Sequence, residues 1–178
     1  MREEVIAEEQ KIADERTRDE ARPEATLLRR HIRELPTLQP AVALERHATV
    51  REAIDAMQQE GTSCMLVVDQ GQLVGVFTER DVVTKVAGQD IDIDHMPVCE
   101  VMQPDPDCLG MDDELVYALH QMSLGAYRHI PVIDDQRQPI AVVSMQAILG
   151  YISEWFPQEM LNLPPSPAHS IARTAEGA

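Results

Sequence analysis

Two stretches of the chain place apolar residues with the period of a helix. The apolar positions of residues 49–57 follow the i, i+3, i+4, i+7 spacing of a helix with one apolar face. The same spacing returns in residues 114–122, shifted by 65 positions. The aligned apolar pairs are Val50 with Leu115, Ala53 with Ala118, Ile54 with Leu119, and Met57 with Met122. We therefore predict two equivalent amphipathic helices and an internal repeat.

Short runs rich in β-branched residues follow each predicted helix at the same offset. Residues 65–69 (Met-Leu-Val-Val-Asp) align with residues 130–134 (Ile-Pro-Val-Ile-Asp), and both read as buried strands that end in a turn. Turns at 70–72 and 135–138 lead to second strands at 73–78 and 139–144, and helices follow over 79–87 and 145–155. Each repeat is predicted to be a helix–strand–strand–helix unit.

Units of this size predict a paired α/β (α+β) architecture. One unit cannot bury both faces of its small sheet, so we expect two units, each with a sheet and two helices, to pack with pseudo-twofold symmetry and leave clefts between them. An extra N-terminal helix is also predicted. Its apolar face, from Glu24 to Leu35, is expected to pack on the first unit. The expected divisions are a charged extension (1–31), the first unit (32–89), a linker (90–98), the second unit (99–156) and a proline-rich tail (157–178).

Charge and cysteine content narrow the function. The chain carries 15 basic and 31 acidic residues in 178, a net charge of -16. A body this acidic repels nucleic-acid backbones and anionic lipid, so neither a nucleic acid nor a membrane is an expected partner. No signal-peptide pattern or spanning apolar stretch is visible. The three cysteines, Cys64, Cys99 and Cys108, have no metal or disulfide spacing, and we predict a reducing cytoplasmic location.

Three segments resemble tandem CBS motifs, the so-called Bateman module, in a stand-alone bacterial-type pair. Residues 75–81 (Gly-Val-Phe-Thr-Glu-Arg-Asp) match the family pattern of Gly, two apolar residues, Thr or Ser, any two residues and Asp. Residues 128–134 (Arg-His-Ile-Pro-Val-Ile-Asp) are similar to the strand that opens many second motifs, and residues 101–104 (Val-Met-Gln-Pro) to the approach to one. The resemblance covers about residues 32–156, and the internal repeat supports it independently.

The first of these segments has chemistry suited to a nucleotide. Thr78 lies where a strand is expected to meet a helix, so its hydroxyl could cap the helix or face a phosphate, which helix N-termini also attract. Asp81 follows one turn later, where its carboxylate could accept hydrogen bonds from two vicinal ribose hydroxyls. Gly75 would let the backbone approach a flat base. Alone, Thr78 and Asp81 equally fit a plain helix cap and first-turn acid.

The resemblance implies a contact across the cleft that favours the ligand interpretation. In CBS pairs, the strand of the other motif meets the phosphate, and here that strand carries Arg128 and His129. His129 fits a half-buried structural histidine equally well, and Arg80 is a further phosphate candidate or a residue facing solvent or a partner. The predicted ligand-binding residues are Gly75, Val76, Phe77, Thr78, Arg80, Asp81, Arg128, His129 and Pro131.

The second unit departs from the pattern, so one ligand site per chain is predicted. Ala141 and Ala147 replace the Gly and Asp, and only Ser144 keeps its role, as a weak second site. The strand partner there, Ser63-Cys64, supplies no cation. The acids and histidine of residues 90–95 do not fit an EF-hand, so no metal is predicted.

The function predicted from these features is regulatory. We expect a module that binds AMP, ADP, ATP or S-adenosylmethionine, needs no cofactor, catalyses no reaction, forms a homodimer and signals to a protein partner. The alternative is a ligand-free CBS scaffold for dimerisation or interaction, with an N-terminal helix that docks a partner.

Overall fold

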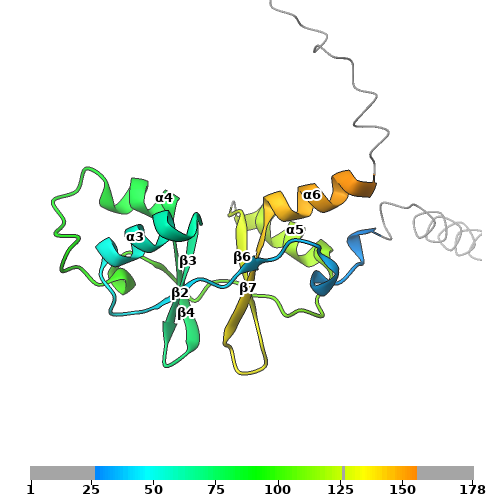
Figure 1. The fold of residues 1–178 in the computed structure, drawn as a ribbon, viewed down its shortest axis with the longest axis horizontal. Helices are drawn as coiled ribbons and strands as arrows, with labels where there is room; N and C mark the ends of the chain where they lie inside the picture. Colours follow the sequence, from blue (N-terminus) through cyan, green and yellow to red (C-terminus); the bar gives the residue numbers. More distant parts are fainter. Residues whose placement is uncertain (1–26, 126, 156–178) are drawn as a thin grey trace, which may run out of the picture.

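The computed structural model describes residues 27–125 and 127–155, which form two lobes side by side (Figure 1). In the first lobe, α3 (Val50–Glu60), β3 (Cys64–Asp69) and β4 (Gln72–Thr78) lead to α4 (Glu79–Asp81), which continues as the π-helical turn η2 (Val82–Val86). In the second lobe, α5 (Leu115–Gly125), β6 (His129–Ile133) and β7 (Pro139–Ser144) lead to α6 (Met145–Trp155). The predicted α/β class and the repeated helix–strand–strand–helix order are confirmed.

Local sequence accounts for where these elements begin and end. Helix α3 starts with a capping box, in which Glu52 N–H donates to Thr49 Oγ1 (3.1 Å) and Thr49 N–H donates to Glu52 Oε2 (2.7 Å). It ends at Gly61, whose φ of +63° suits a residue without a side chain. Gln70 and Gly71, with φ of +52° and +81°, form the two-residue turn between β3 and β4.

The sheet of each lobe includes a short strand from the segment of chain that leads into the other lobe. Strand β1 (Gln39–Pro40) precedes the first lobe but pairs antiparallel with β7 of the second, and β5 (Gln103–Pro104) precedes the second lobe but pairs with β4 of the first. The two sheets therefore have the orders β2-β3-β4-β5, with β2 at Ala43–Glu45, and β1-β7-β6. The chain crosses between the lobes twice. Before each crossing, it adds an edge strand to the sheet of the lobe that it leaves.

The exchange extends to the short 3-10 helices before these strands. Helix η1 (Ile32–Glu34) bonds the second lobe, where Ile32 N–H donates to Asp113 O (2.9 Å), and η3 (Val98–Glu100) bonds the first, where Val98 N–H donates to Ala48 O (2.8 Å). Leu27, Ile32 and Leu35 are buried in the core of the second lobe. The prediction that this segment packs on the first unit is therefore wrong.

The predicted helix from Glu24 to Leu35 is also not continuous. His31 is extended and bridges Glu114, and a separate 3-10 helix follows it. The bridge and the backbone bonds to α5 compete with the helical bonds that the apolar spacing alone would favour. The earlier part of the charged extension and the proline-rich tail lie outside the described residues, and the predicted divisions of the chain stay predictions.

The two lobes share a small apolar cluster between their sheets. It consists of the buried residues Cys64, Leu66, Leu73 and Val142, which come from both sheets. Burial raises the pKa of the Cys64 thiol to about 12, so the thiol stays neutral, as the apolar run around it predicted. In the described part of the chain, no helix has the length and apolar character needed to cross a bilayer.

Candidate functional site

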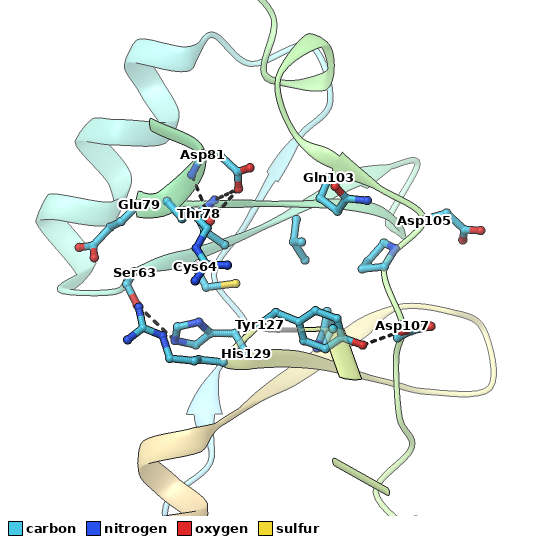
Figure 2. Close-up of a pocket in the computed structure, with 16 residues that line it drawn as sticks. Ser63, Cys64, Thr78, Glu79, Asp81, Gln103, Asp105, Asp107, Tyr127 and His129 are labelled. Atoms are coloured by element: carbon cyan, nitrogen blue, oxygen red, sulfur yellow. Dashed lines mark hydrogen bonds between the residues drawn. The ribbon is translucent and has the colours of Figure 1, made fainter. Parts of the chain in front are cut away.

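A cleft of about 420 Å³ opens between the lobes (Figure 2). One wall comes from the end of β4 and the start of α4, another from β6, and a third from the segment that follows β5. The cleft brings together seven of the predicted ligand-binding residues: Val76, Thr78, Arg80, Asp81, Arg128, His129 and Pro131.

Thr78 and Asp81 form a closed hydrogen-bonded unit at one wall (Figure 2). The Thr78 hydroxyl donates to Asp81 Oδ2 at 2.6 Å and Thr78 N–H donates to the same oxygen at 2.9 Å, while Asp81 N–H donates to Thr78 Oγ1 at 3.3 Å. The other carboxylate oxygen, Oδ1, lies 2.8 Å from Lys85 Nζ. Thr78 is thus the helix cap and Asp81 the first-turn acid that their spacing allowed, and Asp81 is also a nearly buried anion within the cleft.

Across the cleft, Arg128, the residue before β6, supplies positive charge. Arg128 lines the cleft beside His129, whose Nε2 lies 3.2 Å from Ser63 Oγ of the first lobe. Burial lowers the pKa of His129, the neighbouring Arg128 lowers it further, and Glu79 opposes the shift. The hydrogen bond between Ser63 and His129 joins the two lobes. Among the described residues, no hydrogen bond reaches Nδ1, the second ring nitrogen of His129.

Gly75 and Phe77 lie outside the lining of the cleft. The last residues of strand β4 alternate, so Gly75 and Phe77 face the core of the first lobe, while Val76 and Thr78 face the cleft. Phe77 is fully buried, and a Cβ at Gly75 would overlap the Met102 thioether. Because Gly75 has no side chain, the Met102 side chain fits against it. The sequence had predicted that a ligand base, and not a protein side chain, would lie close to Gly75.

Sequence reasoning missed an acidic wall of the cleft. Asp105 and Asp107 follow β5, and the Tyr127 hydroxyl donates to Asp107 Oδ2 at 2.6 Å (Figure 2). Burial and this bond raise the pKa of Tyr127 to about 12, so the ring stays neutral and keeps its proton. These residues reach the cleft only because β5 pairs with β4. The repeated Gln-Pro at 39–40 and 103–104 was the available signal for that pairing.

The second unit presents a cap without an anion. Ser144 is buried, and its hydroxyl accepts from Ala147 N–H at 3.1 Å, so it reproduces the cap of Thr78 without the carboxylate. Ser63 and Cys64, expected beside this second site, line the first cleft. The loop acids have partners of their own, since Asp94 pairs with Arg51 (2.8 Å) and Asp92 with His95 (2.9 Å). The described residues contain no cluster suited to a metal ion.

Comparison with known proteins places this architecture in one family. A family model described as "CBS domain" matches residues 32–88 and 98–154, which together make up more than half of the chain. The chain is 37% identical over 97 residues to the meiotically up-regulated gene 70 protein of Schizosaccharomyces pombe, covering 54% of this chain and 13% of that protein. It is 33% identical over 102 residues to inosine-5'-monophosphate dehydrogenase of Methanocaldococcus jannaschii, covering 57% and 19%. These curated relatives are much longer than the shared region.

Solved structures share the fold at low identity. A putative signal-transduction protein with CBS domains from Burkholderia ambifaria matches with a TM-score of 0.59 and 23% identity, over 82% of this chain and 94% of that one. A CBS domain pair solved in complex with 5'-methylthioadenosine and S-adenosyl-L-methionine matches with a TM-score of 0.59 and 21% identity, over 71% and 99%.

Proposed function

The chain belongs to the CBS-domain family, and from this premise we propose that it is a regulatory module that binds an adenine nucleotide in the cleft between its two motifs. One observation carries the proposal: the Asp81 carboxylate and the Arg128 guanidinium, with His129 beside it, line a single cleft between the lobes. A nucleotide presents sugar hydroxyls to an acceptor and phosphate to cations, so this arrangement suits both ends of the ligand.

The proposed contacts follow the walls of the cleft. Asp81 accepts from the sugar, Arg128 binds phosphate as a charged donor, and His129 adds a neutral donor or acceptor beside it. Val76 and Pro131 offer apolar surface to the base. Arg80 also lines the cleft and is proposed as a second cation for phosphate.

The choice among AMP, ADP, ATP and S-adenosylmethionine follows from charge. Arg128 at one wall favours phosphate, while Asp105 and Asp107 at another favour a positively charged group such as a sulfonium. One structural neighbour was solved with two adenosyl compounds, which supports an adenosyl ligand here. We propose a nucleotide monophosphate or diphosphate first, because Arg128 has no carboxylate partner among the described residues.

Signalling and assembly complete the proposal. A ligand that touches both lobes favours the arrangement in which the cleft is closed, and a protein partner would sense that change. The outer faces of the second-lobe helices expose Tyr117, Leu124 and Leu149. We propose that this face supports a homodimer in the cytoplasm, and sedimentation of a monomer both with and without ligand would contradict it.

Substitution of Asp81 separates ligand binding from helix capping. We expect AMP at 100 times its dissociation constant to stabilise the wild-type protein by about 2.7 kcal/mol, and Asp81→Asn to lose most of that gain. Glu52→Gln is the matched control, because Glu52 closes the equivalent capping box of α3 away from the cleft. Thermal shift assays of both variants with AMP, ADP, ATP and S-adenosylmethionine make the measurement.

The outcomes distinguish the two functions. Without ligand, Glu52→Gln is expected to change stability little, because an amide can still close the capping box, and Asp81→Asn is expected to lose more, because it also gives up the ion pair with Lys85. If no adenine compound at millimolar concentration stabilises the wild-type protein, the nucleotide proposal fails and the result favours the scaffold alternative. If Asp81→Asn keeps the full shift, the ligand binds elsewhere.

A further inference from the structure

Lys85 is held against the Asp81 carboxylate by contacts on three sides. Its Nζ lies 2.8 Å from Asp81 Oδ1 and donates to the carbonyl oxygens of Val101 (2.7 Å) and Met102 (3.3 Å). An ammonium has three protons, so these three acceptors use all of them. Val101 and Met102 immediately precede β5 in the crossing segment. Lys85 therefore links the Asp81 carboxylate to the segment that leads to Asp105 and Asp107.

The contacts of Asp81 leave little room for a ligand. A carboxylate offers about four acceptor positions, two on each oxygen. Oδ2 already accepts from both the hydroxyl and the N–H of Thr78, at 2.6 and 2.9 Å. Oδ1 accepts from Lys85, so one position remains open. The side chain of Asp81 is only 12% exposed, which restricts approach to that position.

We infer that Lys85 is a specificity-determining residue, which limits the Asp81 carboxylate to one hydroxyl of a ligand sugar. The inference rests on the proposed function, in which Asp81 binds the sugar. It changes the expectation that Asp81 accepts from two vicinal hydroxyls, since a second hydroxyl would have to displace either Lys85 or Thr78. One hydroxyl of the ribose thus contributes to affinity, and the other finds no acceptor on Asp81.

The test compares AMP with 2'-deoxy-AMP and 3'-deoxy-AMP by titration calorimetry on the full chain. In the wild-type protein, one deoxy ligand should bind about tenfold or more weakly than AMP, as expected for a lost bond to a charged group, and the other within about threefold. Lys85→Met removes the donor from Oδ1 and opens a second acceptor position. Both deoxy ligands should then bind about tenfold more weakly than AMP.

Two controls separate this role from charge and folding. Lys85→Arg keeps the charge and the donors, so it should keep the one-sided pattern. Arg128→Met removes a cation from the cleft without touching Asp81, so all three ligands should weaken together while the one-sided pattern persists. The wild-type comparison needs no variant, and it stands even if Lys85→Met does not fold.

The failures of the two proposals look different. If no AMP binding is detected in the wild-type protein, the proposed function fails. If AMP binds but both deoxy ligands already weaken equally in the wild-type protein, the inference alone is overturned. An unchanged one-sided pattern in folded Lys85→Met would overturn it too.

Discussion

At the scale of single residues, His129 makes the stability of the fold depend on pH. Burial and Arg128 lower its pKa in the folded protein below the ordinary value of 6.5. The unfolded chain therefore binds this proton more readily, and the stability contributed by neutral His129 is fully present above pH 6.5. It is lost as the pH falls through the folded pKa, because protonation strains a half-buried ring beside Arg128.

Replacement of His129 should remove this part of the pH dependence. His129→Gln keeps a polar group near Ser63 but cannot be protonated, so its free energy of unfolding should fall less than that of the wild-type protein between about pH 7.5 and about pH 5.5. Urea unfolding at both pH values measures the difference. His120→Gln, at an exposed position of α5, should leave the wild-type dependence unchanged. Identical slopes for His129→Gln and wild type would contradict the assignment.

The individual site residues were predictable where chemistry and spacing agree. Thr78 and Asp81 form the expected cap, and Arg128 lines the cleft with them. Gly75 and Phe77 were predicted to contact the ligand because all of residues 75–81 were assumed to face it. The two-residue period of a strand sends alternate residues to opposite faces, which assigns them to the core. That period was visible in the sequence, and so was the i, i+4 spacing of Asp81 and Lys85 on the predicted helix, although the sequence interpretation did not use it.

At the scale of elements, helices and hairpins were predicted well and the crossing strands were not. A long apolar period or a β-branched run is a strong local signal, but β1 and β5 are two residues long and carry no period. Their pairing is set by partners far away in the chain. The acidic wall of the cleft was missed for the same reason, since Asp105 and Asp107 are placed by β5.

The contact between β4 and the crossing segment can be tested at Gly75. Gly75→Ala should destabilise the fold by about 1–3 kcal/mol, because the added Cβ displaces Met102. In a double-mutant cycle measured by urea unfolding, Met102→Ala should relieve part of that cost, so the double variant loses less than the sum of the two. Gly150→Ala on α6 meets open space and should be neutral or stabilising. Strict additivity at Gly75 and Met102 would show that the overlap is not the cause.

At the scale of the whole molecule, each lobe is completed by chain that precedes the other. Ile32 is fully buried in the core of the second lobe, although it precedes the first in sequence, and Val98 is fully buried in the core of the first. Both anchor a 3-10 helix that bonds the start of a helix in the receiving lobe. Two lobes that exchange segments in this way resist separation. The walls of the cleft therefore keep their relative position for a ligand that contacts both lobes.

This exchange predicts that two core substitutions act on the lobe distant in sequence. Ile32→Ala should cost roughly 2–5 kcal/mol and loosen β6 and β7, while Val98→Ala should loosen β3 and β4. Amide hydrogen exchange reports local opening in each lobe, and the two variants serve as controls for each other. Faster exchange confined to β3 and β4 in Ile32→Ala would contradict the crossing. Equal acceleration in both lobes for both variants would instead show that the pair opens as one unit. Because His129 begins β6 and Arg128 directly precedes it, loosening that strand should also weaken nucleotide binding, so Ile32→Ala should lower AMP affinity without touching the cleft.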